Sequence, residues 1–110
     1  MLQTLKTAAE FESVYEKGAR RSSRSFVLFA LPNELARYRF GLTTPRKLGK
    51  AHERNRIRRR VREILRTLEP ASEPASKGGF DVVVNPRRSV HDRDFQELRS
   101  ELLTLLGADI

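Results

Sequence analysis

The apolar residues of the stretch 57–68 recur with the spacing of one face of a helix. They stand at i, i+4, i+7, i+8 and i+11, which forms a single stripe on a helix of about 3.6 residues per turn. Most arginines of the same stretch fall on the opposite side of that helix. The pattern therefore predicts a helix with one buried side and one cationic side. The stripe consists of Ile57, Val61, Ile64, Leu65 and Leu68.

A helix is also predicted near each end of the chain. Thr7 and Glu10 have the spacing of a capping box, and Gly18 can close the short helix that they open. Either Asp92 or Asp94 can cap a last helix, with Gly107 at its end. The apolar stripe of this last helix consists of Phe95, Leu98, Leu102, Leu105 and Leu106.

Runs of apolar residues predict the strands of one sheet. Residues 25–31 are apolar on both strand faces, so one face meets helices and the other either packs on more protein or offers a stacking surface. After a turn at Pro32 and Asn33, residues 38–44 return as the second, antiparallel strand of a hairpin, because the connection is short. Residues 80–84 form a third strand, buried on both faces, which Pro86 ends.

The order of these elements predicts the fold class. Pro70 disfavours a helical residue 69, so the basic helix is expected to end there. Residues 70–79, rich in Pro, Ala, Ser and Gly, then form a flexible connector. The order is α-β-β-α-β-α, with room for one more strand before the basic helix. We therefore predict a single α+β domain over residues 1–110, with helices packed on a small, mostly antiparallel sheet.

The positive charge of the chain is concentrated in residues 46–66. This stretch contains 10 of the 22 Lys and Arg residues and 2 of the 14 Asp and Glu residues, so the rest of the chain carries 12 of each. The net charge of +8 therefore belongs to one segment. Like charges at i and i+4 repel one another along a helix. So many repulsions on one face indicate an anionic partner, and nucleic acid is the abundant polyanion of a cytosol.

Composition limits the possible cellular compartments of the protein and the kinds of site that it can contain. The chain has no cysteine, which excludes disulfides and thiolate metal sites and agrees with a reducing cytosol. No stretch approaches about 18 consecutive apolar residues, and the first seven residues contain no apolar signal segment. We therefore expect a cytoplasmic protein that neither spans a membrane nor is exported.

The chain contains no self-sufficient set of catalytic residues. His52 and His91 have no second histidine at metal-binding spacing, and Asp92 and Asp94 are more simply explained as helix caps. Gly49 is isolated, so no glycine-rich phosphate loop is present. We expect no catalytic residue and no metal held by the protein alone.

Several short motifs include and surround the basic helix. They are residues 41–43 (Gly-Leu-Thr), 46–51 (Arg-Lys-Leu-Gly-Lys-Ala), 54–59 (Arg-Asn-Arg-Ile-Arg-Arg) and 62–63 (Arg-Glu). Together they resemble the signature of the bacterial ribonuclease P protein component. Residues 11–15 with Gly18, residues 24–28, and residues 81–84 followed by Arg87 and Arg88 support the resemblance, which covers about residues 5–106.

The resemblance implies a fold, binding partners, and separate roles for the protein and the RNA. The fold would be α+β with a left-handed βαβ crossover around the basic helix, similar to a domain of ribosomal protein S5, although such crossovers are nearly always right-handed. The protein, a monomer when alone, would bind ribonuclease P RNA, and together they would remove the 5′ leader from precursor tRNA. The RNA would carry the reaction with the Mg²⁺ that it binds, which agrees with the absence of catalytic residues.

The resemblance also assigns roles to individual residues. Aromatic faces stack on unpaired bases, and arginine forks bind phosphates. Residues of the basic helix and of the loop before it would bind the catalytic RNA: Arg46, Lys47, Lys50, Arg54, Asn55, Arg56, Arg58, Arg59 and Arg62. A central cleft would hold the single-stranded leader, with three aromatic residues inside and two arginines at its mouth: Phe11, Tyr15, Phe29, Arg87 and Arg88.

Other functions must be weighed against this one. A structural rRNA-binding protein would use the same helix, with Phe11, Tyr15 and Phe29 as ordinary core, so the solvent exposure of these rings discriminates between the two. A DNA-binding basic region needs a dimerising zipper, and no heptads follow Leu68. A membrane-surface helix needs Trp or Phe on its apolar stripe, which has neither. The structural rRNA-binding protein is the remaining alternative.

Overall fold

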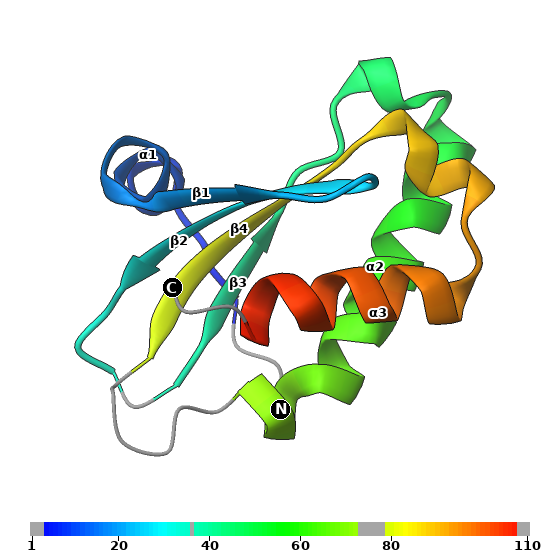
Figure 1. The fold of residues 1–110 in the computed structure, drawn as a ribbon. Coiled ribbons are helices and arrows are strands. Elements are labelled where there is room, and N and C mark those ends of the chain that lie inside the picture. The colour runs from blue at the N-terminus through cyan, green and yellow to red at the C-terminus, as the bar shows by residue number, and fades with distance from the viewer. Residues whose placement is uncertain (1–3, 36, 73–78, 108–110) are drawn as a thin grey trace.

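A four-stranded sheet separates one helix from two others in the computed structural model, which describes residues 4–35, 37–72 and 79–107 (Figure 1). Helix α1 (Ala8–Lys17) covers one face of the sheet, and helices α2 (Ala51–Ser72) and α3 (Phe95–Gly107) cover the other. The strands are β1 (Ala19–Ser22), β2 (Phe26–Pro32), β3 (Arg39–Leu42) and β4 (Phe80–Pro86). Two short 3₁₀ helices, η1 (Arg46–Leu48) and η2 (Arg88–Asp92), precede α2 and α3. The predicted α+β class and the order of elements are confirmed.

The strands lie in the order β1-β2-β4-β3. Strand β2 pairs antiparallel with both β1 and β4, whereas β3 pairs in parallel with β4. The predicted hairpin between residues 25–31 and 38–44 is therefore wrong, because β4 lies between these two strands. The valines of β4 are apolar on both faces, and a central position buries both faces of a strand. Strands β3 and β4, joined through α2, form the crossover between parallel strands that the resemblance implies.

The core is divided between the two faces of the sheet. Successive side chains of a strand point to opposite faces. Val82 and Val84 belong to the core under α2 and α3, and Val83 belongs to a smaller core under α1. All three valines are fully buried, so this part of the predicted third strand is buried on both faces.

Helix α2 buries its predicted apolar stripe against the larger core. Ile57, Val61, Ile64 and Leu65 are at most 2% exposed. Leu68 also belongs to the helix, but its side chain lies outside the described residues. The stripe therefore anchors the helix to the sheet and to α3, and the arginines are left on the other side.

The C-terminal end of α2 differs from the prediction. The helix continues through Pro70 to Ser72, so its predicted end at residue 69 is wrong, and residues 70–72 are helical rather than part of a connector. A proline so close to the end of a helix removes one backbone donor and leaves the earlier turns intact. Residues 73–78 of the predicted connector lie outside the described residues.

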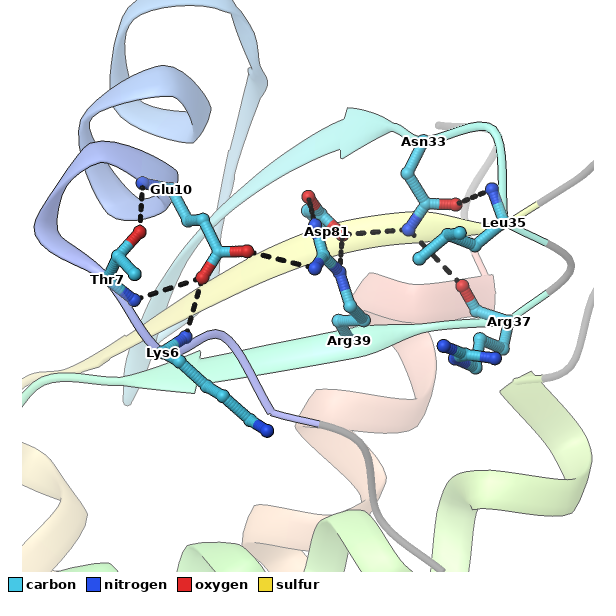
Figure 2. A network of polar contacts seen from close by, with 8 residues as sticks. All are labelled: Lys6, Thr7, Glu10, Asn33, Leu35, Arg37, Arg39 and Asp81. Carbon is cyan, nitrogen blue, oxygen red and sulfur yellow. Dashed lines mark hydrogen bonds and ion pairs between the residues drawn. The ribbon is translucent and has the colours of Figure 1, made fainter.

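A polar network fixes α1 to the sheet (Figure 2). Arg39 donates to Asp81 on the neighbouring strand from Nε at 2.8 Å and from Nη2 at 2.7 Å, and its Nη1 donates to Glu10 at 2.9 Å. Asn33 donates to the same Asp81 carboxylate at 2.7 Å. Glu10 also completes the predicted capping box with Thr7. The network therefore joins the start of α1 to β3 and β4.

A second capping box begins α3. The N–H of Glu97 donates to Asp94 Oδ1 at 2.8 Å, and the N–H of Asp94 donates to Glu97 Oε1 at 3.3 Å. Of the two predicted caps, Asp94 is therefore the one used, and Asp92 belongs to η2.

Candidate nucleic-acid interface

The cationic side of α2 faces solvent. Within the described residues, the ion pair on this helix is that between Glu63 and Arg66, at 2.8 Å. Most guanidinium groups of the helix thus have no carboxylate partner in that part of the chain, and the helix presents a concentrated positive surface. The exposed side chains are Asn55, Arg56, Arg59, Arg62 and Arg66, and the half-buried ones are Arg54, Arg58 and Arg60.

Two arginines in the first turns of α2 differ in their hydrogen bonding. Arg58 Nη1 donates to Asn55 Oδ1 one turn earlier. The Nε atom of Arg54 is buried and has no hydrogen-bond partner among the described residues. A buried donor without a partner is costly, so Arg54 carries a local energetic cost in the free protein.

The loop before α2 is held against η2. Leu48 is 1% exposed and anchors η1 in the core. The carbonyl oxygen of Lys47 accepts from Arg88 Nη1 at 3.1 Å, and His91 Nε2 contacts the carbonyl oxygen of Leu48. Gly49 has φ 134°, a value that favours glycine. These contacts present the exposed side chains of Arg46, Lys47 and Lys50 next to the start of α2.

The three predicted cleft aromatics gather where α1 crosses the sheet. Tyr15 and Phe29 form an edge-to-face pair with ring centroids 5.0 Å apart, and Tyr15 is 40% exposed. Phe29 and Phe11 are half-buried. Phe11 rests on the backbone of β3, since a Cβ at Gly41 would lie 2.6 Å from its Cζ atom. Of the three rings, Tyr15 is thus the most open to a ligand, and Phe11 is largely part of the small core.

A groove lies next to these rings and is connected to Tyr15 through Asn85. Its polar floor is centred on Asn85, whose Oδ1 accepts from Tyr15 Oη at 2.7 Å and from Thr43 Oγ1 at 2.6 Å. Asn85 Nδ2 donates to the carbonyl oxygen of Val27 at 3.3 Å. The rim is cationic. The lining residues are Val27, Thr43, Pro45, Lys47, Leu48, Asn85, Pro86, Arg87 and Arg88.

Lys47 and Arg88 join the two predicted surfaces. Both line the groove, and Arg88 also donates to the backbone carbonyl oxygen of Lys47, in the loop that leads into α2. The groove and the basic helix are therefore parts of one continuous surface, while the roles assigned to their residues stay predictions. Sequence reasoning missed Asn85 and Thr43 as groove residues. Asn85 carried a signal, because it is a polar residue at the end of an apolar strand.

Two features of the described part of the chain bear on other functions. No group of three or more His, Cys, Asp or Glu side chains is gathered closely enough in that part of the chain to hold a metal ion. None of the helices described there is long and apolar enough to cross a membrane.

Comparisons with known proteins agree with this geometry. The family model described as Ribonuclease P matches residues 2–108. The ribonuclease P protein component of Shouchella clausii is 40% identical over 101 residues, which cover 91% of this chain and 80% of the relative. The ribonuclease P protein component of Geobacillus kaustophilus is 35% identical over 103 residues, which cover 93% of this chain and 82% of the relative. The solved ribonuclease P protein of Thermotoga maritima matches with a TM-score of 0.84 and 33% identity, over 98% of each chain.

A mixed sheet with a basic crossover helix, and a cationic groove next to aromatic rings, is the arrangement expected of a small RNA-binding protein of the α+β class. The matches in sequence and in structure extend over nearly the whole chain. The chain therefore belongs to the ribonuclease P family, whose members named above are protein components of that enzyme. This membership confirms the predicted function in tRNA 5′ processing, and no finding favours the structural rRNA-binding alternative.

Proposed function

We propose that this protein is the accessory subunit of a cytoplasmic ribonuclease P in which an RNA subunit carries the catalytic reaction. The protein joins that RNA as a monomer and binds it through the basic helix. It binds the 5′ leader of precursor tRNA through the groove beside α1. Cleavage then removes the leader and leaves the mature 5′ end of the tRNA.

Contact between α2 and RNA phosphates is supported by the surplus of arginine on its open face. A guanidinium fork can donate two parallel hydrogen bonds to one phosphate, and each neutralised phosphate releases bound counterions. RNA binding also relieves the repulsion between arginines that are one turn apart. The residues proposed for this contact are Arg46, Lys47, Lys50, Arg54, Asn55, Arg56, Arg58, Arg59 and Arg62.

Leader binding is supported chiefly by one observation: the exposed ring of Tyr15, paired with Phe29, is hydrogen-bonded to Asn85 in the lining of a groove with a cationic rim. Stacking on an aromatic ring tolerates any base, because every base has a π-face. Lys47, Arg87 and Arg88 on the rim suit the phosphates of the same strand. Such a groove can hold leaders of different sequence in an extended form.

Magnesium is assigned to the RNA subunit in this proposal. The carboxylates in the described part of the chain form no cluster that fits a resident metal ion. No step of the proposal therefore passes through a metal held by the protein. The arginines of α2 would act by neutralising nearby phosphates, which lowers the repulsion between RNA segments that must come together.

Reconstitution tests the proposal. A bacterial ribonuclease P RNA is assayed at a magnesium concentration too low for the RNA to act alone, with and without this protein. We expect the protein to restore cleavage of precursor tRNA at the mature 5′ end, and we expect the protein without RNA to cleave at no magnesium concentration. Cleavage by the protein alone would contradict the assignment of catalysis to RNA, and a lack of rescue would contradict the accessory role.

A variant pair tests the groove by the affinity of the reconstituted complex for tRNA. Tyr15→Ala removes the exposed ring, whereas Tyr15→Phe keeps the ring and removes only the hydroxyl. We expect Tyr15→Ala to weaken binding of precursor tRNA about 5- to 100-fold, the effect of one lost base stack, and to leave binding of mature tRNA unchanged. Tyr15→Phe should retain most of the affinity. Equal losses of affinity for precursor and mature tRNA would show that the groove does not bind the leader.

A further inference from the structure

A second pocket borders α2 on the side that faces α3. It has a volume of about 510 Å³, within the range of small-ligand sites. Three arginines and one glutamate of α2 form most of its wall, and the first residue of α3 forms the rest. Phe95 and Arg60 have no part in the RNA contacts proposed above. The lining residues are Arg56, Arg59, Arg60, Glu63 and Phe95.

The charge of this pocket is poorly compensated. Glu63 is engaged by Arg66 at 2.8 Å, outside the pocket lining. The three lining arginines form no ion pair among the described residues. Partial burial, together with the positive charge of Arg56, lowers the pKa of Arg60, against the opposing effect of Asp94. A bound anion would therefore offset an electrostatic cost that the free protein carries.

Arg60 is held in position by α3. Its Nη2 donates to the backbone carbonyl oxygen of Arg93 at 2.6 Å, just before the helix begins. That contact uses one edge of the guanidinium group. Because a guanidinium carries five N–H donors, the remaining donors stay available to an acceptor in the pocket.

Phe95 supplies an aromatic wall. It is half-buried and packs against the larger core, so the ring is fixed while part of it lines the pocket. The capping box of Asp94 and Glu97 fixes the start of α3 beside it. A fixed aromatic ring next to arginines is the combination that binds an unpaired nucleotide, since the ring stacks on the base and the arginines bind the phosphate.

We propose that this pocket binds one unpaired nucleotide of the ribonuclease P RNA, with its base on Phe95 and its phosphate between Arg59 and Arg60. The proposal rests on the proposed function and adds a contact to the same RNA. A nucleotide within a duplex is not suited, because its base faces are covered by its neighbours. An acidic peptide would satisfy the arginines but would leave the aromatic wall unused.

A tryptophan reporter tests the stacked base directly. The chain contains no tryptophan, so Phe95→Trp introduces a single fluorophore at the pocket wall. We expect a short oligoadenylate to quench its emission in a saturable way, and we expect inorganic polyphosphate and polyglutamate, which carry charge without bases, to leave it unchanged. The control is Leu103→Trp, at a position 41% exposed on the same helix, which should not respond. Equal quenching by polyphosphate or polyglutamate, or an equal response at position 103, would overturn the proposal.

Two milder variants test the contact with ribonuclease P RNA. Phe95→Leu keeps an apolar side chain but has no aromatic face, and we expect affinity to fall about 5- to 100-fold with the salt dependence unchanged. Arg60→Gln keeps a donor for the Arg93 carbonyl but loses the charge, and we expect the slope of log affinity against log salt to shrink by about 0.7 to 0.9. Lys17→Gln, which removes one charge from α1 on the other face of the sheet, is the control. Thermal unfolding checks that each variant folds.

The outcomes separate this inference from the proposed function. If the unaltered protein binds ribonuclease P RNA, and Phe95→Leu and Arg60→Gln bind it with unchanged affinity and salt dependence, the pocket is not an RNA contact and the proposed function stands. If the unaltered protein itself does not bind that RNA, both are overturned.

Discussion

At the scale of single residues, Glu101 shows how one carboxylate holds a turn. Its Oε1 accepts from Ser23 Oγ at 2.6 Å and from the N–H of Ser25 at 2.8 Å, and its Oε2 accepts from Ser25 Oγ at 2.8 Å. Partial burial by itself raises the pKa of Glu101, but the hydrogen bonds from Ser23 and Ser25 outweigh it, so the pKa is lowered. Glu101 therefore joins α3 to the turn between β1 and β2 in its charged form.

This residue predicts part of the pH dependence of stability. A carboxylate whose pKa is lower in the folded state stabilises the fold above its unfolded-state pKa, and the contribution is lost as the pH falls through the folded-state pKa. We expect Glu101→Gln to lower the free energy of unfolding by about 1–3 kcal/mol at neutral pH, because charge-assisted hydrogen bonds are lost. The difference from the unaltered protein should shrink as the pH falls below about 4.5, the ordinary pKa. Urea unfolding at a series of pH values measures this difference in the free energy of unfolding. A difference that stays constant with pH would contradict a stabilising role for the charged form of Glu101.

At the scale of elements, the docking of α1 depends on close contact with β3. Phe11 lies against Gly41, where a Cβ atom would be 2.6 Å from the Cζ atom and 2.7 Å from the Cε2 atom of the ring. The backbone of Gly41 does not have a positive φ, so a larger residue is excluded by side-chain contacts, chiefly with Phe11 and also with Leu5 Cδ1 at 3.1 Å. The position of α1, and with it the position of Tyr15 over the groove, therefore depends on one glycine of the sheet.

A double-mutant cycle tests this contact. We expect Gly41→Ala to destabilise the fold by about 1–3 kcal/mol, because the added methyl group overpacks the ring. In a Phe11→Leu background the same change should cost less, since the smaller side chain leaves room for the methyl group. Gly107→Ala is the matched control, because a Cβ there meets nothing within 4 Å. Denaturant unfolding measures all four variants, and additive costs at positions 11 and 41 would show that the two residues do not interact.

At the scale of the whole molecule, one side carries the charge imbalance. The net charge is +8, and the stretch 46–66 holds 10 of the 22 basic residues. Ion pairs lie elsewhere as well: Arg39 pairs with Glu10 and Asp81 across the sheet face under α1. The free protein thus combines a compensated face with a face under electrostatic repulsion, and the RNA contact proposed for α2 would relieve that repulsion.

This asymmetry predicts that salt stabilises the free protein. The screening length falls from about 30 Å at 0.01 M salt to about 10 Å at 0.1 M, which weakens the repulsion between the arginines of α2. We expect the thermal midpoint to rise by several degrees over this range, equivalent to about 1 kcal/mol. The double variant Arg58→Gln, Arg62→Gln should show a smaller rise. A midpoint that falls with added salt would mean that favourable ion pairs outweigh the repulsion along α2.

The local features of this protein follow from its sequence. The apolar stripe of α2, the capping box of α1 and the cationic face were all predicted correctly, because each depends on residues within a few turns of one another. The resemblance of the motifs around the basic helix likewise predicted the family. The edge strand β1 has no apolar pattern, because Arg20 and Arg21 lie on a mostly exposed strand, so no local signal marked it clearly.

The tertiary structure decided how distant segments meet. Residues 25–31 and 38–44 predict a hairpin, yet β4, more than thirty residues further along, lies between them, because its valines need cover on both faces. The same insertion places Asn85 between Tyr15 and Thr43, and the packing of α3 on α2 brings Phe95 beside Arg60. Strand pairing and pockets depend on contacts between residues far apart in the chain. Helix caps and helical faces depend on residues close together in the chain, and for that reason they could be predicted from the residues alone, whereas strand pairing and pockets could not.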